Sequence, residues 1–425
     1  MELNLMEKLE VENFLVIKTA KLDIKKINIL IGPQANGKSI LAKLTYFFQN
    51  LSKIFLEGIS SNKSKTDLNK SIVAKFETNF PRYSWEGTNF KIDYQINELN
   101  FRIEGIKGSR GKTNIKITYS DALSKLFSSK KQILSRKLDA YKTSENPKKA
   151  TIDKRFVFFD VVLDPLRSEN FSYFFDDPIF IPASRSFFAN LQKNIFTFLA
   201  SNLDIDPFLK EFGGLYETSK RFYNNKRLFE EHKNTRLNLI KSFEEIINGK
   251  YEYDDEQDWI RLKNNRINLA NASSGQQESL PMLLVLCMQP LLLRNRESMI
   301  FIEEPEAHLF PTSQGKIVSI LSILYNEIGS RFFITSHSPY ILSALNNFIL
   351  AGDAVKSGTL KNEEFTEINK SGIPIRFEDI SAYTIKNGTL ESILDNEYRL
   401  IGSEMLDEIS DHFEDVTNTI LSKGH

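Results

Sequence analysis

Eight residues near the N-terminus, GPQANGKS at positions 32–39, have the glycine, lysine and serine spacing of a loop that binds phosphate. Gly32 and Gly37 permit tight backbone conformations, so the chain can wrap round a phosphate with its N–H groups pointing inward. Lys38 can reach the β- and γ-phosphates of a nucleotide, and the Ser39 hydroxyl can coordinate Mg²⁺. We therefore expect ATP and Mg²⁺ to bind at Gly32, Pro33, Gln34, Ala35, Asn36, Gly37, Lys38 and Ser39.

The residues on both sides of this loop predict the strand and the helix that it needs. Residues 27–31, INILI, form a short apolar run typical of a buried strand. Residues 39–56 place apolar side chains at helical spacing. A helix that begins near Lys38 adds the positive end of its dipole to the phosphate site. The alternative, a glycine turn with only a structural role, does not account for this context.

Two adjacent acids, Glu303 and Glu304, close a second apolar run, MIFI. Adjacent side chains at the end of a strand point in different directions. One carboxylate can therefore face Mg²⁺ while its neighbour faces the water that attacks the phosphate. We assign Glu303 to the metal and Glu304 to the water; the alternative is a pair of solvated acids at a strand end.

His337 closes a third apolar run, FFIT, and its imidazole could contact the γ-phosphate. A histidine in a turn is, by itself, more often structural. In the company of the loop and the paired acids we assign His337 to phosphate sensing, which makes Glu304 and His337 the two candidate catalytic residues.

A small-residue turn, Ser274-Gly275-Gln276-Gln277, precedes a very apolar helical run. The N-terminus of a helix is a second anion site, and one chain rarely needs two for one phosphate. We therefore expect Ser274, Gly275 and Gln276 to serve the nucleotide of a neighbouring subunit, so that ATP lies between two protomers. The alternative is a simple helix cap on Ser274.

Bulk properties set the class of protein. The chain has 425 residues, which predicts two or three lobes, and its formal net charge is zero. The single Cys287 excludes an intrachain disulfide and lies in an apolar run, which favours a buried thiol. The N-terminal residues lack a signal-peptide core and the longest apolar run is too short to cross a bilayer, so we expect a cytoplasmic protein without a membrane partner.

The pattern along the chain predicts four regions. We expect two halves of one nucleotide-binding head at 1–56 and 259–350, an insertion at 57–258 and a C-terminal accessory region at 351–425. The insertion has strand-like alternation, a basic stretch at 105–155 that is either a solvated loop or a patch for an acidic partner, and a helical pattern at 206–248 interrupted at Gly213-Gly214. In the accessory region an amphipathic helix, which packs on its own domain or on a partner, is predicted from Met405, Ile409, Phe413, Val416 and Ile420.

Taken as a set, LEVENFLVIKTAKLDIKKINILIGPQANGKS, NASSGQQE, MIFIEEPEAHLFP and FITSHSP resemble the ABC-type ATPases of the SMC, RecF and OLD kind. The resemblance covers about 1–50 and 260–350. It implies an α/β head, a mixed sheet with flanking helices, with an inserted α+β or helical region and a C-terminal helical tail. It also implies that Ser274 to Gln277 act in trans and that His337 is the switch histidine.

This sequence departs from the family pattern at two positions. Glu303 stands where most ABC proteins have Asp, and Gln276 replaces a Gly and would crowd the γ-phosphate. The family's glutamine loop has Gln49 as one candidate; Arg185 is a different candidate, for a cation near the nucleotide, a subunit contact or an ordinary salt bridge.

Beyond the motifs, the N-terminal block, the PASR element and ISAYTIKNGTLESIL resemble the ATPase subunits of the PARIS phage-defence systems. Fewer than 90 residues follow His337, so the Toprim nuclease domain of OLD proteins does not fit. That resemblance implies a homo-oligomer, at least a dimer with a closed, hexamer-like ring as the larger form. It also implies a separate Toprim-type nuclease as effector and a phage-encoded trigger. A RecF- or SMC-like DNA-repair ATPase stays open as the alternative, with DNA as partner; a transporter ATPase is disfavoured by the long insertion.

Overall fold

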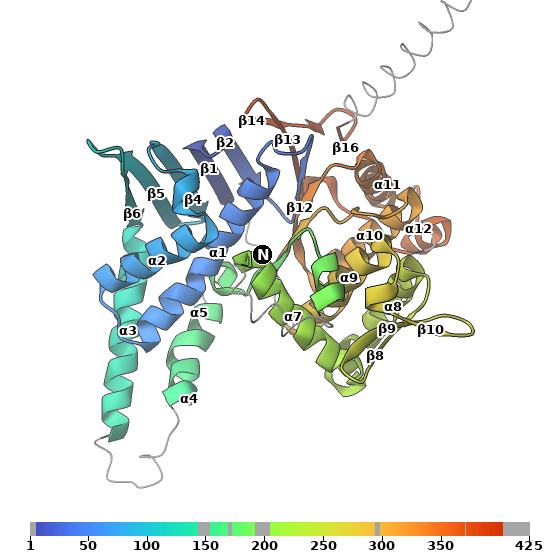
Figure 1. Cartoon of the computed structure of the whole chain (residues 1–425), viewed down its shortest axis with the longest axis horizontal. Helices are drawn as coiled ribbons and strands as arrows, with labels where there is room; N and C mark the ends of the chain where they lie inside the picture. The colour runs from blue at the N-terminus through green and yellow to red at the C-terminus, as the bar shows by residue number, and fades with distance from the viewer. Residues whose placement is uncertain are drawn as a thin grey trace, which may run out of the picture.

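The structure of the chain is a computed structural model that describes residues 6–142, 154–168, 172–191, 205–293, 298–369 and 371–402 (Figure 1). Its centre is a mixed sheet of eleven strands in the order β6-β5-β4-β1-β2-β14-β13-β3-β12-β11-β7. The bounds of these strands are β1 Glu7–Phe14, β2 Ile17–Ile24, β3 Ile27–Ile31, β4 Phe90–Ile96, β5 Leu99–Lys107, β6 Thr113–Tyr119, β7 Ile179–Ile181, β11 Met299–Glu303, β12 Arg331–Ser336, β13 Ile380–Lys386 and β14 Thr389–Ser392. This large mixed sheet with its flanking helices confirms the predicted α/β class.

The helices lie in two groups, one on each face of the sheet (Figure 1). The first group is α1 Lys38–Ser60, α2 Lys65–Asn79, α3 Asp121–Lys142, α4 Lys154–Phe158 and α5 Asp164–Ser168. The second is α7 Pro207–Tyr223, α8 Lys233–Ile247, α9 Ser274–Leu292, α10 Pro311–Ile323, α11 Pro339–Lys356 and α12 Asn362–Asn369. Two small sheets complete the fold, from β8 Lys250–Asp254, β9 Gln257–Arg261 and β10 Arg266–Asn268, and from β15 Leu394–Asp395 and β16 Leu400–Ile401.

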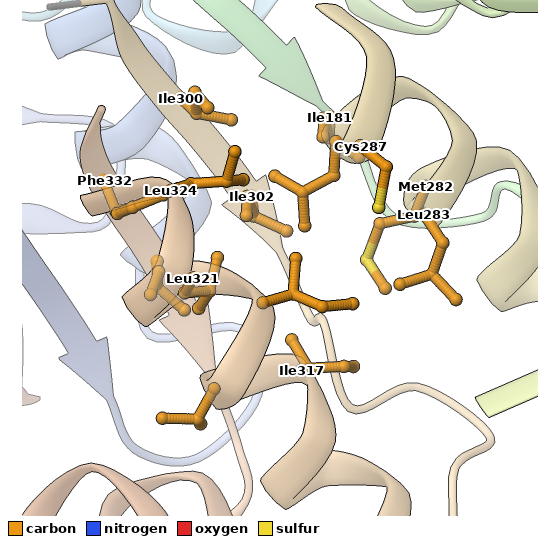
Figure 2. Close-up of a cluster of buried hydrophobic side chains, with 14 of the residues drawn as sticks. Ile181, Met282, Leu283, Cys287, Ile300, Ile302, Ile317, Leu321, Leu324 and Phe332 are labelled. Carbon is orange, nitrogen blue, oxygen red and sulfur yellow. The ribbon is translucent and has the colours of Figure 1, made fainter. Parts of the chain in front are cut away.

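The parallel strands consist mostly of buried apolar residues because both of their faces are covered. In β11, Ile300 and Ile302 pack in one core while Met299 and Phe301 pack in the other. Successive side chains of a strand point to opposite faces, so each parallel strand supplies both cores. Figure 2 shows the first core, where Ile300 and Ile302 meet α9 and its buried Cys287. The predicted buried thiol is confirmed.

The sheet brings the carboxyl ends of five parallel strands to one edge. Strand β3 pairs in parallel with β12 on one side and with β13 on the other, and β11 pairs in parallel with β12 and β7. Every loop that leaves the carboxyl end of these strands therefore emerges at the same edge, which is where ligands bind in open α/β sheets. The loops after β3, β7, β11 and β12 carry the predicted site residues.

Two features differ from the expectations. Residues Gly213-Gly214 do not interrupt the helical pattern: α7 runs through them, and the break comes later, at the turn and 3₁₀ segment of residues 224–232. A Cβ at Gly213 would lie 2.8 Å from Phe188 Cε1, so this glycine permits close packing. The boundary expected at 350 also does not coincide with a boundary of the sheet, because β13 lies beside β3.

The insertion and the accessory region contain both described and undescribed parts of the expected elements. Within the insertion, β8 and β9 pair antiparallel as a hairpin. The basic stretch at 105–155 begins in β5, turns into β6 and continues along α3, while 143–153 lie outside the described residues. The helix predicted from Met405 to Ile420 also lies outside them. Of the helices that are described, none is both long and apolar enough to cross a membrane.

Candidate nucleotide-binding site

The phosphate loop joins the end of β3 to the start of α1. Gly32 has φ +142°, Ala35 has φ +61° and Gly37 has φ +98°, so the loop needs the left-handed conformations that glycine adopts most easily. A Cβ at Gly37 would lie 2.4 Å from Ile17 Cδ1, so a side chain here would displace Ile17 in addition to straining the backbone. Asn36 donates a hydrogen bond to the Ile385 carbonyl at 3.3 Å, which ties the loop to β13.

The Lys38 ammonium is buried and lies over the loop. It donates to the carbonyl oxygens of Gly32 at 2.6 Å and Pro33 at 2.7 Å, and its third neighbour is His337 Nδ1 at 3.3 Å. These three acceptors match the three donors of an ammonium group. Burial lowers the Lys38 pKa to about 8, and the negative charges of Glu304 and Glu306 act in the opposite direction. Lys38 is therefore held at the phosphate loop by groups that a phosphate oxygen can replace.

Glu303 and Ser39 fit a magnesium ion. Glu303 ends β11 and is buried, and the Ser39 side chain is near enough to lower the pKa of its carboxyl, against the larger opposite effect of burial. Glu303 Oε2 accepts from the Ala183 N–H at 3.2 Å, while the buried Oε1 has no hydrogen-bond partner. Burial raises the pKa of this carboxyl because its charged form is poorly solvated there, and a cation bound beside it would stabilise that charged form. Nowhere in the described residues, this site included, do three His, Cys, Asp or Glu side chains converge on a possible ion, so water and nucleotide phosphates would complete the coordination of Mg²⁺.

Glu304 and His337 face each other across the edge of the sheet. Glu304 Oε1 lies 3.3 Å from His337 Nε2, and the Glu304 N–H donates to the Thr335 carbonyl at 2.9 Å. Because His337 Nδ1 accepts from Lys38, the ring proton of the neutral imidazole is on Nε2 and points at Glu304. Glu304 has φ +45°, a conformation that a residue with a side chain adopts only when its surroundings hold it. The structure therefore brings Lys38, His337 and Glu304 together, and Glu303 points to different partners.

Sequence reasoning missed Glu306. Its Oε1 accepts from the His337 N–H at 2.6 Å and from Ser336 Oγ at 2.9 Å, so this carboxylate fixes the turn that carries the imidazole. The only signal was its place in the acidic motif EEPE, three residues after Glu303.

The two residues considered for other roles lie elsewhere. Gln49 is buried and donates to Glu7 Oε1 at 2.6 Å, together with Tyr94, away from the phosphate loop. Arg185 is completely buried, which excludes a contact with a second subunit, and it forms an ion pair with Glu278. Of the alternatives for Arg185, the salt bridge is the one that the geometry supports, with added contacts to the backbone at Glu303 and Glu304.

The turn at Ser274 begins α9, but its cap is one residue earlier than expected. Ser273 is the N-cap residue, and its hydroxyl and the Gln276 side chain form a capping box. Gln276 Nε2 also donates to the Ile247 carbonyl at 2.7 Å, so this side chain turns inward and does not crowd a phosphate. Ser274 is exposed at the first position of the helix, where N–H groups lack intrahelical acceptors. Among the described residues no hydrogen bond or ion pair joins Ser274, Gly275 or Gln276 to the loop of the same chain.

Part of the chain matches the model of a known protein family. Residues 179–342 match the family model described as AAA ATPase domain. Among solved structures, the chain is similar to the Smc head bound to the C-winged helix domain of ScpA, with 12% identity, coverage of 91% of this chain and 96% of that one, and a TM-score of 0.39.

Two further solved structures are similar at the same level. The SMC head domain from Thermotoga maritima has 10% identity, 92% and 98% coverage and a TM-score of 0.35. The recombination mediator protein RecF–ATPrS has 13% identity, 92% and 98% coverage and a TM-score of 0.29. No curated protein matches the chain.

Proposed function

We propose that this chain is a regulatory ATPase that binds and hydrolyses ATP between two of its own copies. The observation that carries the proposal is the line of contacts from Lys38 through His337 to Glu304, at the edge of the sheet where the phosphate loop also ends. This line places a cation, an imidazole and a carboxylate within reach of one terminal phosphate.

Each residue has a defined part in the reaction. The loop from Gly32 to Gly37 wraps the phosphates, and Lys38 balances the charge of the β- and γ-phosphates. Ser39 and Glu303 would hold Mg²⁺, which neutralises the phosphate oxygens when it is bound. Glu304 orients the attacking water and accepts its proton. His337 donates its Nε2–H to Glu304, or, when ATP is bound, to the γ-phosphate as the acceptor in place of Glu304.

The second copy would supply the N-terminus of α9. Ser274 is exposed and the side chain of Gln276 is turned away. The Gln276 N–H is bonded to the Ser273 hydroxyl, so the N–H groups of Ser274 and Gly275 are the ones that could meet the γ-phosphate of another chain. ATP then joins the copies in a homo-oligomer, at least a dimer, because each nucleotide contacts two chains. A closed, hexamer-like ring extends the same contact.

We further propose that the oligomer holds a separate nuclease of the Toprim type and releases it when a phage-encoded trigger binds. This part rests on the resemblance of the non-motif regions to the ATPase subunits of PARIS systems. On one face of the sheet lysines pair with acids of neighbouring strands, Lys8 with Asp23 at 3.0 Å and Lys91 with Glu12 at 3.7 Å, so their positive charges are neutralised within the chain. That balance favours the regulatory function over the RecF- or SMC-like alternative for this face.

Complementation between two inactive variants tests the shared site. Lys38→Ala removes the phosphate cation of one chain, and Ser274→Arg blocks the helix N-terminus of the other. Each variant alone should lose most of its ATP-dependent association and turnover, down to a low residual rate. An equimolar mixture should recover up to about a quarter of wild-type turnover, since about half of random dimers are mixed and each holds one intact site. Mass measurement with and without ATP checks the association, and a mixture as inactive as its parts would refute the shared site.

A further inference from the structure

Arg185 contacts the backbone of the two acids at the end of β11. Its guanidinium donates to the carbonyl oxygens of Glu303 at 2.6 Å and Glu304 at 2.9 Å, and also to that of Pro182 at 3.0 Å. Arg185 is completely buried, so each of these bonds is shielded from water. The planar five-donor guanidinium can serve several carbonyls at once, which a lysine cannot.

Glu278 connects the same arginine to α9. The Arg185 Nε atom lies 3.3 Å from Glu278 Oε1 and donates to the Glu278 carbonyl at 3.2 Å. The two carboxylate oxygens of Glu278 also accept the N–H groups of Arg185 at 3.0 Å and Ser186 at 2.8 Å. Glu278 is buried on α9 one turn after Ser274, so this ion pair fixes the start of α9 to the ends of β7 and β11.

A second contact joins the start of α9 to the turn after Glu304. A Cβ at Gly275 would lie 2.8 Å from the carbonyl oxygen of His308, so the helix and this turn meet without room for a side chain. The first turn of α9 therefore has two rigid contacts with the segment from Glu303 to His308.

We propose that Arg185 and Glu278 are positioning residues that transmit the position of the α9 N-terminus to the Glu304 carboxylate. Glu304 has a left-handed backbone, and the donor from Arg185 to its carbonyl helps to hold that conformation. When the N-terminus of α9 binds the nucleotide of a second copy, its position becomes fixed. Glu278 and Arg185 then transmit that position to the backbone of Glu304 in the same chain. The inference rests on the proposed function, because the nucleotide of the second copy is the signal. In this proposal Arg185 does not contact the nucleotide. It couples nucleotide binding at one site of the oligomer to hydrolysis at the neighbouring site.

The first test compares Arg185→Lys with Arg331→Lys. Arg331 is a matched control because it is also buried in an ion pair with a glutamate, Glu7, but starts β12 at the opposite edge of the sheet. Both variants should unfold at a lower temperature. Only Arg185→Lys should lower kcat, by about 10-fold or more, while KM for ATP and the affinity for a non-hydrolysed ATP analogue stay within about 2-fold. An Arg185→Lys protein that is folded and keeps wild-type kcat would overturn the inference, as would an equal loss of kcat in Arg331→Lys.

The second test asks whether Arg185 and Ser274 act through one route. Ser274→Arg, Arg185→Lys and the double variant are compared for kcat, with association measured on each by sedimentation. A common route predicts that the double variant is no slower than the slower single variant, and effects that multiply would overturn the inference alone. If Ser274→Arg leaves association and kcat unchanged, the proposed function fails as well. Should Arg185→Lys not fold, Glu278→Gln takes its place in both tests with the same expected results, because it removes the charge of the pair and keeps an acceptor.

Discussion

The Lys38 ammonium donates to Nδ1 of His337 at 3.3 Å, which joins the phosphate loop after β3 to the turn after the adjacent strand β12. The contact fixes the tautomer of the imidazole, because a lysine can only donate. Nε2 then carries the proton and faces Glu304. The hydrogen bond between Lys38 and His337 therefore determines that the ring nitrogen facing Glu304 is the protonated one.

Lys38→Ala should abolish this arrangement and weaken ATP binding. Charge-assisted hydrogen bonds contribute roughly 1.5–3 kcal/mol, so the affinity for ATP should fall by at least about 10-fold. Lys53→Ala is the control, since Lys53 lies on the same helix, is well exposed and pairs with Glu211 at 3.7 Å. Titration with a fluorescent ATP analogue measures both variants, and unchanged affinity in Lys38→Ala would contradict the assignment of the loop.

The affinity for ATP should also fall as the pH rises above about 8. Burial lowers the Lys38 pKa to about 8 in the unliganded protein, and bound phosphates raise it because they favour the charged form. Below that pH the ammonium is already protonated and the affinity is constant. Above it, binding must take up a proton, and the affinity falls until the pH passes the pKa of the complex. In Lys38→Arg, whose side chain stays charged, the residual affinity should not change between about pH 8 and 9.5.

Glu304→Gln should keep ATP bound and slow its hydrolysis. The amide still accepts the hydrogen bond from His337 but cannot take the proton of the attacking water, and a general base contributes about 10²–10⁴ to the rate. Glu327→Gln, at an exposed position after α10, is the control. Single-turnover kinetics with saturating ATP and Mg²⁺ separate binding from chemistry. Normal turnover in Glu304→Gln would assign the base to another residue.

The sequence predicted the parts of the site that depend on local pattern. Gly32 to Ser39, Glu303, Glu304 and His337 each follow a short apolar run, and parallel strands bring such positions to one edge of a sheet. Spacing along the chain carries that information, so the meeting of loop, acids and imidazole could be expected before the structure.

The supporting contacts could not be predicted in the same way. Arg185 donates to carbonyl oxygens of residues more than a hundred positions away. Every residue has a carbonyl oxygen, so the sequence does not indicate which of them an arginine contacts. Its partner Glu278 lies inside an apolar helix, where one acid does not reveal what it contacts. The place of β13 beside β3 depends on a pairing between opposite ends of the chain. Gly213 was misread as a helix break because its role, contact with Phe188, is tertiary.

Two helical glycines with different surroundings test the contact between α9 and the acidic turn. At Gly315, on α10, an added Cβ meets nothing within 4 Å, so Gly315→Ala should leave kcat unchanged and stabilise the protein by up to about 1 kcal/mol through helix propensity. At Gly275 the same methyl would lie 2.8 Å from the His308 carbonyl oxygen, and one of the two must move. Gly275→Ala should therefore not show the increase in stability expected for Gly315→Ala. It should also lower kcat, because the turn that the methyl displaces begins at Glu304. Thermal unfolding and steady-state ATPase assays on both variants make the comparison. Equal stabilisation and equal kcat in the two would mean that α9 and the turn are not in rigid contact.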